Sequence, residues 1–384
     1  MEKSSVILTD TQNSIWVEQL DQQFGSFQVV KRTLRGGRQD GVDVIDVVRD
    51  HFVTRIIPTR GMGLAEVTLG SDSESCRFGW NSPVCGPVHP NWVPVAEPSG
   101  LGWLDGFNEL FVRCGLKSNG APEFDEAGQL QFPLHGRIAN LPANQVQINY
   151  DPSSETLEII GTVIESRFHF DKFQLVTCYR FDSSSTSIKV SDEVTNFGGS
   201  RNDFQMLYHY NLGPGLLEPG GQIMIPAEEV VPRDLPSAEH IADWQQVQPP
   251  KAGSTETAYF FKPKANSDGN SLALLTNSDK SLAAGIRYSP AVLPCFTLWK
   301  NSVSEHDGYV IGLEPGTNFP NTHSFEAHHD RVVSLEPVET KSIEFELVFA
   351  NSSEVVATLV DESKAVQADS APEISDMPRP SWCE

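Results

Sequence analysis

The sequence predicts an all-β protein, built as a large antiparallel β-sandwich with few short helices. Three observations lead to this fold class. Segments rich in β-branched and aromatic residues recur along the 384 residues, clusters of turn-forming residues separate them, and helical periodicity is scarce. The 29 glycines and 26 prolines are consistent with many strands joined by long loops.

The predicted strands run from near residue 42 to residue 350. In the most regular one, Ile343, Phe345 and Leu347 alternate with glutamates, which is the period of a strand buried on one face. Segments such as 151–155 and 266–270 are rich in Ser, Asn, Asp and Gly and predict turns. We expect strands over residues 42–48, 52–58, 157–165, 173–181, 185–196, 271–276, 283–288, 307–314 and 341–350.

One segment near the N-terminus has a helical pattern. Residues 9–20 predict a short helix that begins with Thr9 or Asp10 as its N-cap. The chain contains neither glycine-rich nucleotide-binding motif, and it has no internal repeat. A Rossmann fold, a P-loop and a solenoid therefore have no support.

The chain is expected to form one large domain. We expect residues 1–25 to form an N-terminal helix or extension and residues 26–355 to form a single sandwich. Two stretches, about 71–106 and 214–253, are irregular and long enough to be functional loops. The first is rich in tryptophan, so we expect it to be an ordered wall over a cleft. Residues 356–384 are acidic and polar and predict a flexible tail.

Charge and composition exclude several functions. The formal net charge is -23, whereas binding to nucleic acid needs clustered Lys and Arg. The first residues contain no long apolar stretch, so we expect no secretory signal, and no stretch approaches the roughly 18 apolar residues that cross a bilayer. The six cysteines lie far apart, without zinc-site spacing. We expect a cytoplasmic monomer or homodimer with neither nucleic-acid nor membrane partners.

Four segments place polar side chains on an apolar frame. In the first, Arg60 follows a predicted strand and precedes Gly61 in a tight turn, so its guanidinium faces either a ligand or solvent. In the second, His135, Arg137 and Asn140 lie between apolar residues, as the fixed polar groups of small-molecule sites do. A histidine beside a glycine is also common in purely structural roles.

The third and fourth segments are strand ends. By alternation His209 and Asn211 share one face of a strand with Leu207, although a histidine in such a place is often only part of the core. Glu314 ends an apolar strand and precedes a Pro-Gly turn. Burial raises the pKa of a carboxyl, which suits a general base, whereas a glutamate at a sheet edge would simply be solvated.

A metal site is the main rival use for the histidines. His323, His328, His329 and Asp330 lie close together in the sequence. They lack the helical spacing of metalloprotease ligands and the pattern of a zinc finger, so we expect no metal. A serine or cysteine nucleophile has no motif either.

Together the four segments resemble the galactose mutarotase, or aldose 1-epimerase, superfamily. IGLEPGTNFPN is similar to the strand end that carries the family's catalytic glutamate and selects Glu314. LYHYNLG is similar to the family's N-H-x-Y-F-N-L segment and selects His209. HGRIANLPA resembles a histidine–glycine segment of hexose-6-phosphate mutarotases and selects His135. The resemblance implies a galactose mutarotase-like sandwich that binds a small-molecule carbohydrate without a cofactor.

Two features depart from the family pattern. The strand with D-F-R, which supplies a sugar-binding aspartate, is not recognisable, and Asp243 is the replacement that we consider. The loop GWNSPVCGPVHPNW has no counterpart that we know, which indicates a separate branch of unknown function. The residues expected to bind the sugar are Arg60, Trp80, His89, Arg137, Asn140, Asn211 and Asp243.

The reaction that the resemblance implies is interconversion of the α and β anomers of an aldose. Glu314 would take the proton of the O1 hydroxyl and His209 would protonate the ring oxygen O5, while His135 would hold O5 or share the acid role. The alternatives are a carbohydrate-binding protein without turnover and a different sugar isomerase or lyase on the same scaffold. Binding alone requires no acid and base, whereas fold resemblance does not separate the two kinds of enzyme.

Overall fold

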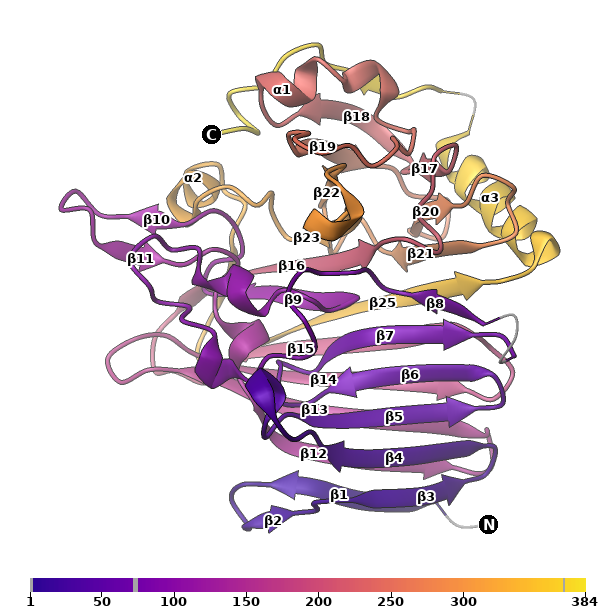
Figure 1. Ribbon diagram of the computed structural model, residues 1–384. Helices are drawn as coiled ribbons and strands as arrows, with labels where there is room; N and C mark the ends of the chain where they lie inside the picture. The colour runs from indigo at the N-terminus through magenta and orange to yellow at the C-terminus, as the bar shows by residue number, and fades with distance from the viewer. Residues whose placement is uncertain (1–2, 72–74, 369) are drawn as a thin grey trace.

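The strands of the protein form two large sheets that pack face to face (Figure 1). The computed structural model describes residues 3–71, 75–368 and 370–384. Among these residues, every strand pair is antiparallel except β18 with β26. The predicted all-β class and all nine predicted strands are confirmed.

The first sheet has ten strands and forms the layer that lies behind β4–β7 in Figure 1. Across the sheet they are β17 (Gln222–Met224), β20 (Ser271–Thr276), β21 (Ala283–Tyr288), β25 (Thr340–Ala350), β15 (Ile188–Asn196), β14 (Lys172–Asp182), β13 (Thr156–Ser166), β12 (Ala143–Asp151), β1 (Ser4–Asp10) and β2 (Ile15–Trp16).

The second sheet has fourteen strands and carries the candidate site. They are β26 (Glu373–Ile374), β18 (Ala227–Pro232), β19 (Thr257–Pro263), β22 (Cys295–Asn301), β23 (Val310–Gly316), β16 (Asn202–Leu212), β9 (Phe111–Leu116), β7 (Gly63–Leu69), β6 (Phe52–Ile57), β5 (Asp43–Arg49), β4 (Phe27–Thr33) and β3 (Leu20–Phe24), with β24 (Val333–Leu335) beside β16 and β8 (Cys76–Phe78) beside β7.

The remaining elements are short, apart from one helix. A small hairpin, β10 (Glu123–Phe124) and β11 (Leu130–Phe132), projects from one side (Figure 1). The α-helices are α1 (Leu235–Ala238), α2 (His323–His328) and α3 (Ser353–Gln367), and the 3-10 helices are η1 (Gly37–Gln39), η2 (Pro90–Trp92), η3 (Gly102–Gly106), η4 (Ile138–Asn140), η5 (Ile241–Asp243) and η6 (Glu305–Asp307). None of the described helices is both long enough and apolar enough to span a membrane.

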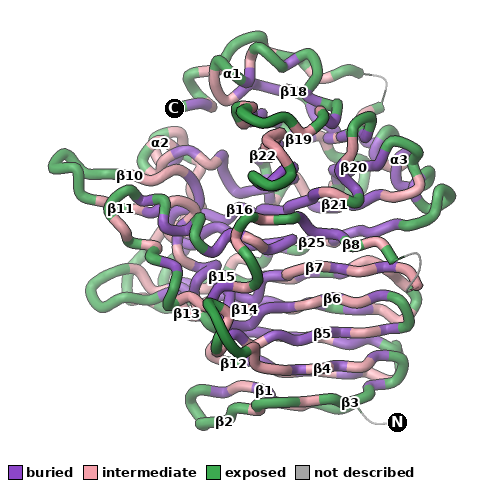
Figure 2. The backbone as a smooth tube through the Cα atoms, in the orientation of Figure 1, coloured by how far each residue is buried: buried purple, intermediate pink, exposed green. Residues whose placement is uncertain are grey.

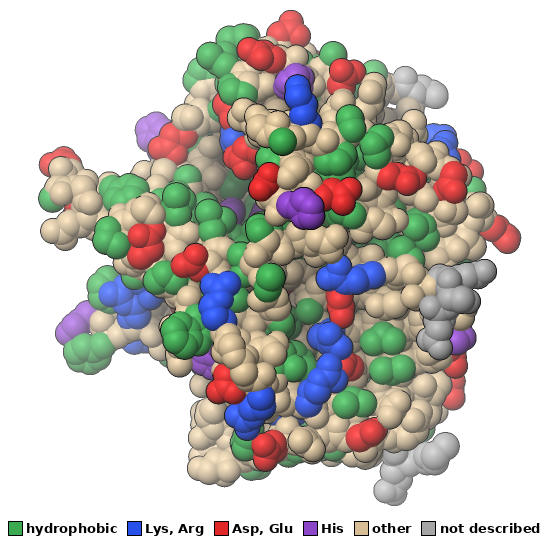
Figure 3. All heavy atoms as spheres, in the orientation of Figure 1, with side chains coloured by type: hydrophobic (Ala, Val, Ile, Leu, Met, Phe, Trp, Pro, Cys, Tyr) green, Lys and Arg blue, Asp and Glu red, His purple; other side chains and the backbone are tan. Residues whose placement is uncertain are grey.

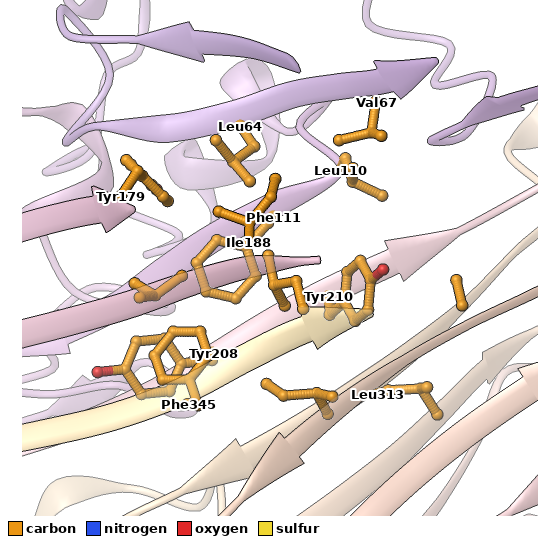
Figure 4. Packing of buried hydrophobic residues seen from close by; sticks show 14 of the residues in the cluster. Leu64, Val67, Leu110, Phe111, Tyr179, Ile188, Tyr208, Tyr210, Leu313 and Phe345 are labelled. Carbon is orange, nitrogen blue, oxygen red and sulfur yellow. The ribbon is translucent and has the colours of Figure 1, made fainter. Parts of the chain in front are cut away.

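The main hydrophobic core fills the space between the two sheets (Figure 4). Phe111 and Tyr208 of the second sheet stack with their ring centroids 5.7 Å apart, and Phe345 of the first sheet lies 4.5 Å from Tyr208. Burying one such side chain contributes about 1.5–3 kcal/mol. Figure 2 shows buried residues along the strands and exposed residues at their connecting turns. The predicted burial of Ile343, Phe345 and Leu347 on one face of β25 is confirmed.

The predicted N-terminal helix is wrong. Residues 4–10 form β1, which pairs with β12, and a turn follows before β2. Leu8 is fully buried in the core, so pairing on the sheet outweighs the weak local helix preference. Asp10 does cap a turn, because its Oδ1 accepts hydrogen bonds from the backbone N–H groups of Gln12 and Asn13.

The expected flexible tail is packed against the body. Ser352 caps α3, which lies on β20 with Val356 and Val360 buried beside Leu272. At the chain end, Cys383 is buried in a cluster with Phe319. The apolar side of α3 therefore packs on the sheet, although most residues of this segment are polar. The irregular stretch expected over 214–253 also differs, because it contains β17, β18 and α1.

Candidate functional site

The site is built around His209 and Glu314 on the neighbouring strands β16 and β23. Tyr210 pairs with Leu313 and Leu207 with Gly316, so His209 and Glu314 face one another across the two strands. His209 Nε2 lies 3.2 Å from Glu314 Oε1. The side chains are only 5% and 3% exposed. Two residues 105 positions apart in sequence thus form one buried acid–base pair.

Three aromatic rings form the wall beside this pair. The ring centroids of Phe107, Trp299 and Trp103 lie 5.1, 5.4 and 6.3 Å from that of His209. Trp103 belongs to η3, within the Trp-rich stretch 71–106, of which residues 72–74 lie outside the described residues. The wall excludes water, which strengthens electrostatic interactions at the pair.

His135 is the second histidine of the site. Its ring centroid lies 5.6 Å from that of His209 and 4.6 Å from that of Trp103. Its backbone has a φ of 55°, a conformation that costs energy for a residue other than glycine. Hydrogen bonds from His135 N to the Gly120 oxygen and from Gly115 N to the His135 oxygen hold it there. Such backbone strain at a cleft is typical of functional positions.

The ring orientation of His135 defines its tautomer. His135 Nδ1 lies 2.8 Å from the backbone oxygen of Asn119. A carbonyl oxygen can only accept, so Nδ1 carries the hydrogen and Nε2 is bare in the neutral ring. Burial lowers the pKa of His135 to about 4, so this neutral form dominates near pH 7.

Two buried amide side chains link the segment that contacts His135 to the segment that follows Glu314. The side chains of Asn119 and Asn318 donate to one another's oxygens, both at 2.9 Å. Farther along, Glu326 accepts two hydrogen bonds from Arg331 and one from Phe319 N, which anchors the segment after β23. These bonds fix the backbone that follows Glu314.

Burial favours the neutral form of both members of the central pair. It raises the pKa of Glu314 well above its ordinary value, and the nearby carboxylate of Glu256 adds to this effect. Burial likewise lowers the pKa of His209 well below its ordinary value, with a smaller contribution from His135. Carboxyl and imidazole groups shifted in these directions by burial are typical of functional sites.

The polar atoms of the pair are incompletely hydrogen-bonded. Among the described residues, Glu314 Oε1 and His209 Nδ1 have no hydrogen-bond partner, and the 3.2 Å contact between the two residues is not aligned as a hydrogen bond. Trp103 Nε1 and Thr297 Oγ1 also lack partners. Buried polar atoms are usually paired, so this group of unpaired atoms indicates space for a polar ligand.

Gly312 makes room for the pair. It lies on the same face of β23 as Glu314, and a Cβ there would overlap Glu314 Oε1 and lie 3.1 Å from His209 Cε1. Only glycine allows both side chains to occupy their observed positions.

A charged group beside Trp299 was not predicted from the sequence. Trp299 Nε1 donates to Glu256 Oε2 at 2.8 Å, and Arg233 Nη2 lies 3.1 Å from Glu256 Oε1. Arg233 also pairs with Asp234 at 2.8 Å. The only sequence signal was the Arg-Asp dipeptide after β18, since the relation of Trp299 to Glu314 depends on strand register.

Four of the predicted sugar-binding residues take part in a buried hydrogen-bond network beside the pair. Arg60 is fully buried, donates to Glu109 at 2.8 Å and also bonds Asn140, so its guanidinium is engaged within the protein. Trp80 Nε1 and Asn211 Nδ2 both donate to the backbone oxygen of Glu109, at 3.1 and 3.0 Å. Arg60 also donates to the oxygen of Gly106, and this network holds η3 and its aromatic wall in position.

The other three predicted residues lie elsewhere. His89 caps η2 by accepting a hydrogen bond from Asn91 N. Asp243 lies in η5 and lines a cavity with Lys300, whose side chain points away from that of Trp299 on β22. Arg137 lines a cavity with Gly136 and Glu165, apart from the central pair.

The surface is hollowed between the projecting β10–β11 hairpin and the upper part of the molecule that carries α1, and histidine atoms are visible inside (Figure 3). No group of three or more His, Cys, Asp or Glu side chains among the described residues is arranged to hold a metal ion. What the arrangement can do is move protons: it holds a carboxyl group and an imidazole in contact, beside a second imidazole with a bare nitrogen.

Comparison with known proteins supports the fold. No curated protein matches the sequence. A Klebsiella pneumoniae structure described as a "putative aldose 1-epimerase" is 29% identical, with a TM-score of 0.93 over 98% of this chain and 99% of that one. A galactose mutarotase-like protein from Clostridium acetobutylicum is 13% identical, with a TM-score of 0.58 over 85% of this chain and 99% of that one.

The resemblance to galactose mutarotases is thereby confirmed for the fold. A family model described as "Domain of unknown function (DUF4432)" matches residues 39–349. This match covers both strands of the central pair, and the chain belongs to the DUF4432 family.

Proposed function

We propose that this protein is an aldose 1-epimerase-like isomerase that interconverts the α and β anomers of a sugar. The observation that carries the proposal is the buried contact of 3.2 Å between His209 and Glu314, whose polar atoms lack partners beside an aromatic wall. Mutarotation needs one proton removed from the O1 hydroxyl and one delivered to O5, and this pair is suited to both transfers.

The pKa shifts of the pair suggest how it becomes active. Because the pKa of Glu314 is raised and that of His209 is lowered, both shifts favour the state in which the carboxyl group holds the proton. A sugar hydroxyl that donates to Glu314 favours its ionised form. Transfer of the proton across the contact to His209 then gives a carboxylate base and an imidazolium acid in one step.

His135 has a narrower role than the sequence predicted. A bare Nε2 can accept a hydrogen bond from a sugar hydroxyl, but it cannot donate one to O5, which itself carries no hydrogen. We therefore assign His135 to binding a hydroxyl group, with Glu256, beside Trp299, as a second acceptor. The face of Trp299 offers an apolar platform for the C–H groups of the ring.

The proposal is tested by NMR of anomer exchange in freshly dissolved α-aldoses. We expect wild type to accelerate exchange and Glu314→Gln to reduce the rate constant by about 10²–10⁴-fold, because the variant lacks the base. The matched control is Glu344→Gln, since Glu344 is an exposed glutamate of β25 far in sequence from the pair, and it should retain wild-type activity.

The same experiment separates the alternatives. Sugar binding without accelerated exchange in wild type, across a broad panel of aldoses, would refute the proposed activity and favour a carbohydrate-binding protein. Full activity in Glu314→Gln would refute the assigned base.

A further inference from the structure

A cavity lies beside the turn that carries His135, apart from the His209–Glu314 pair. Its volume is about 160 Å³, enough for a small organic molecule rather than a single water. It is lined by Arg137, the hairpin tip between β13 and β14, and the strand end at Ser118. Phe132, Pro133 and Phe170 supply an apolar wall. We call it the Arg137 cavity.

The Arg137 cavity contains more positive charge than its own carboxylates neutralise. Among the described residues, the Arg137 guanidinium forms neither a hydrogen bond nor an ion pair, although the residue is partly buried. Arg167 stacks over the ring of Phe170 at 3.9 Å and has no carboxylate partner in the described part of the chain. Lys117 is paired, since its Nζ lies 3.5 Å from Asp171.

The remaining carboxyl group of the cavity is a weak counter-ion. Glu165 is only 8% exposed, and its Oε2 accepts a hydrogen bond of 3.1 Å from Leu116 N. Burial raises the pKa of Glu165. Burial and the neighbouring charge of Arg167 lower the pKa of Arg137. Both pKa shifts mean that the positive charge of Arg137 is poorly compensated, so binding of an anion in the cavity would be favoured.

A buried hydroxyl adds a second donor. Ser118 is 1% exposed and lines the cavity, yet its Oγ has no hydrogen-bond partner among the described residues. A buried hydroxyl without a partner is destabilising, and a ligand oxygen would supply the missing acceptor.

The cavity shares a loop with the proposed catalytic site. His135 faces His209, whereas the next two residues, Gly136 and Arg137, line the cavity. Gly136 has a φ of 70° and packs on the backbone oxygens of Gly115 and Ser118, where no side chain would fit. Whatever binds Arg137 therefore contacts the same rigid turn that positions His135.

We propose that the Arg137 cavity binds a small organic oxyanion, an apolar ring or chain that carries one acidic group. The fork of a guanidinium pairs with an oxyanion through two hydrogen bonds, Ser118 donates a third, and the phenylalanine rings cover the apolar part. This site is separate from the sugar cleft and does not depend on the proposed reaction.

The test is isothermal titration calorimetry with benzoate and, separately, with inorganic phosphate, in the absence of sugar. Hydrogen bonds to charged groups contribute about 1.5–3 kcal/mol, so we expect Arg137→Gln to weaken benzoate binding by about 10–150-fold. Ser118→Ala removes a neutral donor and should weaken it by about 2–10-fold. Arg35→Gln is the control, because it makes the same change in net charge at an exposed arginine.

The outcomes are distinct because the Arg137 side chain makes no hydrogen bond or ion pair among the described residues, and urea unfolding verifies that each variant is intact. Benzoate binding that is lost in Arg137→Gln and kept in Arg35→Gln supports the site. Absence of saturable binding to wild type, or equal binding to Arg137→Gln, overturns it. Phosphate binding as tightly as benzoate would overturn the role of the apolar wall.

Discussion

Two buried acid–base pairs lie on opposite faces of the second sheet, beside β16, and they differ in how completely they are hydrogen-bonded. Arg113 of β9 pairs in register with Tyr208 of β16, and its side chain enters the core to meet Asp192. His209 is the next residue along β16, and its side chain points the other way to meet Glu314.

The core pair is fully satisfied. Arg113 donates five hydrogen bonds: two to Asp192, at 2.6 and 2.9 Å, and one each to Met62, Tyr179 and Thr177. All five guanidinium hydrogens are used, and both residues are completely buried. No capacity remains for a ligand, so this pair serves the structure alone.

The cleft pair has the same depth of burial but lacks this support. Burial favours the neutral form of both its residues, and a polar atom of each has no partner among the described residues. The comparison teaches that burial of ionisable groups does not identify a functional site. A functional site is indicated when buried ionisable groups also have polar atoms without hydrogen-bond partners, because those atoms can bind a substrate.

The largest expected effect comes from breaking the core pair. Asp192→Asn leaves the Arg113 guanidinium buried without a counter-charge, and we expect a loss of about 3–5 kcal/mol in the free energy of unfolding. Urea unfolding measures it, with Asp361→Asn on the exposed side of α3 as the control. A loss below about 1 kcal/mol would mean that the pair is not structural.

A smaller effect is expected where the cleft pair meets Gly312. Gly312→Ala forces Glu314 and His209 to shift, so we expect a stability loss of about 1–3 kcal/mol together with reduced anomer exchange. Gly199→Ala is the matched control, because a Cβ there meets nothing within 4 Å. An active Gly312→Ala protein would show that the observed pair geometry is not required.

The smallest effect is expected from Glu314→Gln on stability, and its sign is opposite to that of Asp192→Asn. Since burial raises the folded pKa of Glu314, the folded wild type binds more protons than the unfolded chain above pH 4.5. Wild-type stability therefore declines as pH rises from 4.5 towards the folded pKa, and the variant lacks this decline.

At neutral pH we expect Glu314→Gln to be more stable than wild type by about 1 kcal/mol, with the difference shrinking towards pH 4.5. Urea midpoints measured across this pH range test the prediction. If the variant is less stable than wild type by several kcal/mol at every pH, Glu314 stabilises the fold, as the Arg113–Asp192 pair does.

Several parts of this protein were predictable because they depend on local sequence. The alternation of apolar and polar residues predicted the strand β25. It also correctly predicted that His209 and Tyr208 lie on opposite faces of β16. Segment resemblance brought Glu314, His209 and His135 together, and the ring distances are consistent with one site. Arg60 could not be assigned, because the carboxylate that buries it, Glu109, lies 49 positions away.

The sequence by itself determined the fold class and the strand periodicity, since side-chain alternation and turn chemistry act over a few residues. The central acid–base pair was proposed from the resemblance of its two segments to a known family. Only the tertiary structure decided which polar residues lie near this pair. Trp299 reaches it through the register of β22 against β23, and Glu256 through its hydrogen bond to Trp299, which no local pattern encodes. The N-terminal strand and the docked α3 were likewise decided by distant partners, because hydrogen bonding and apolar burial on an existing sheet outweigh local propensity.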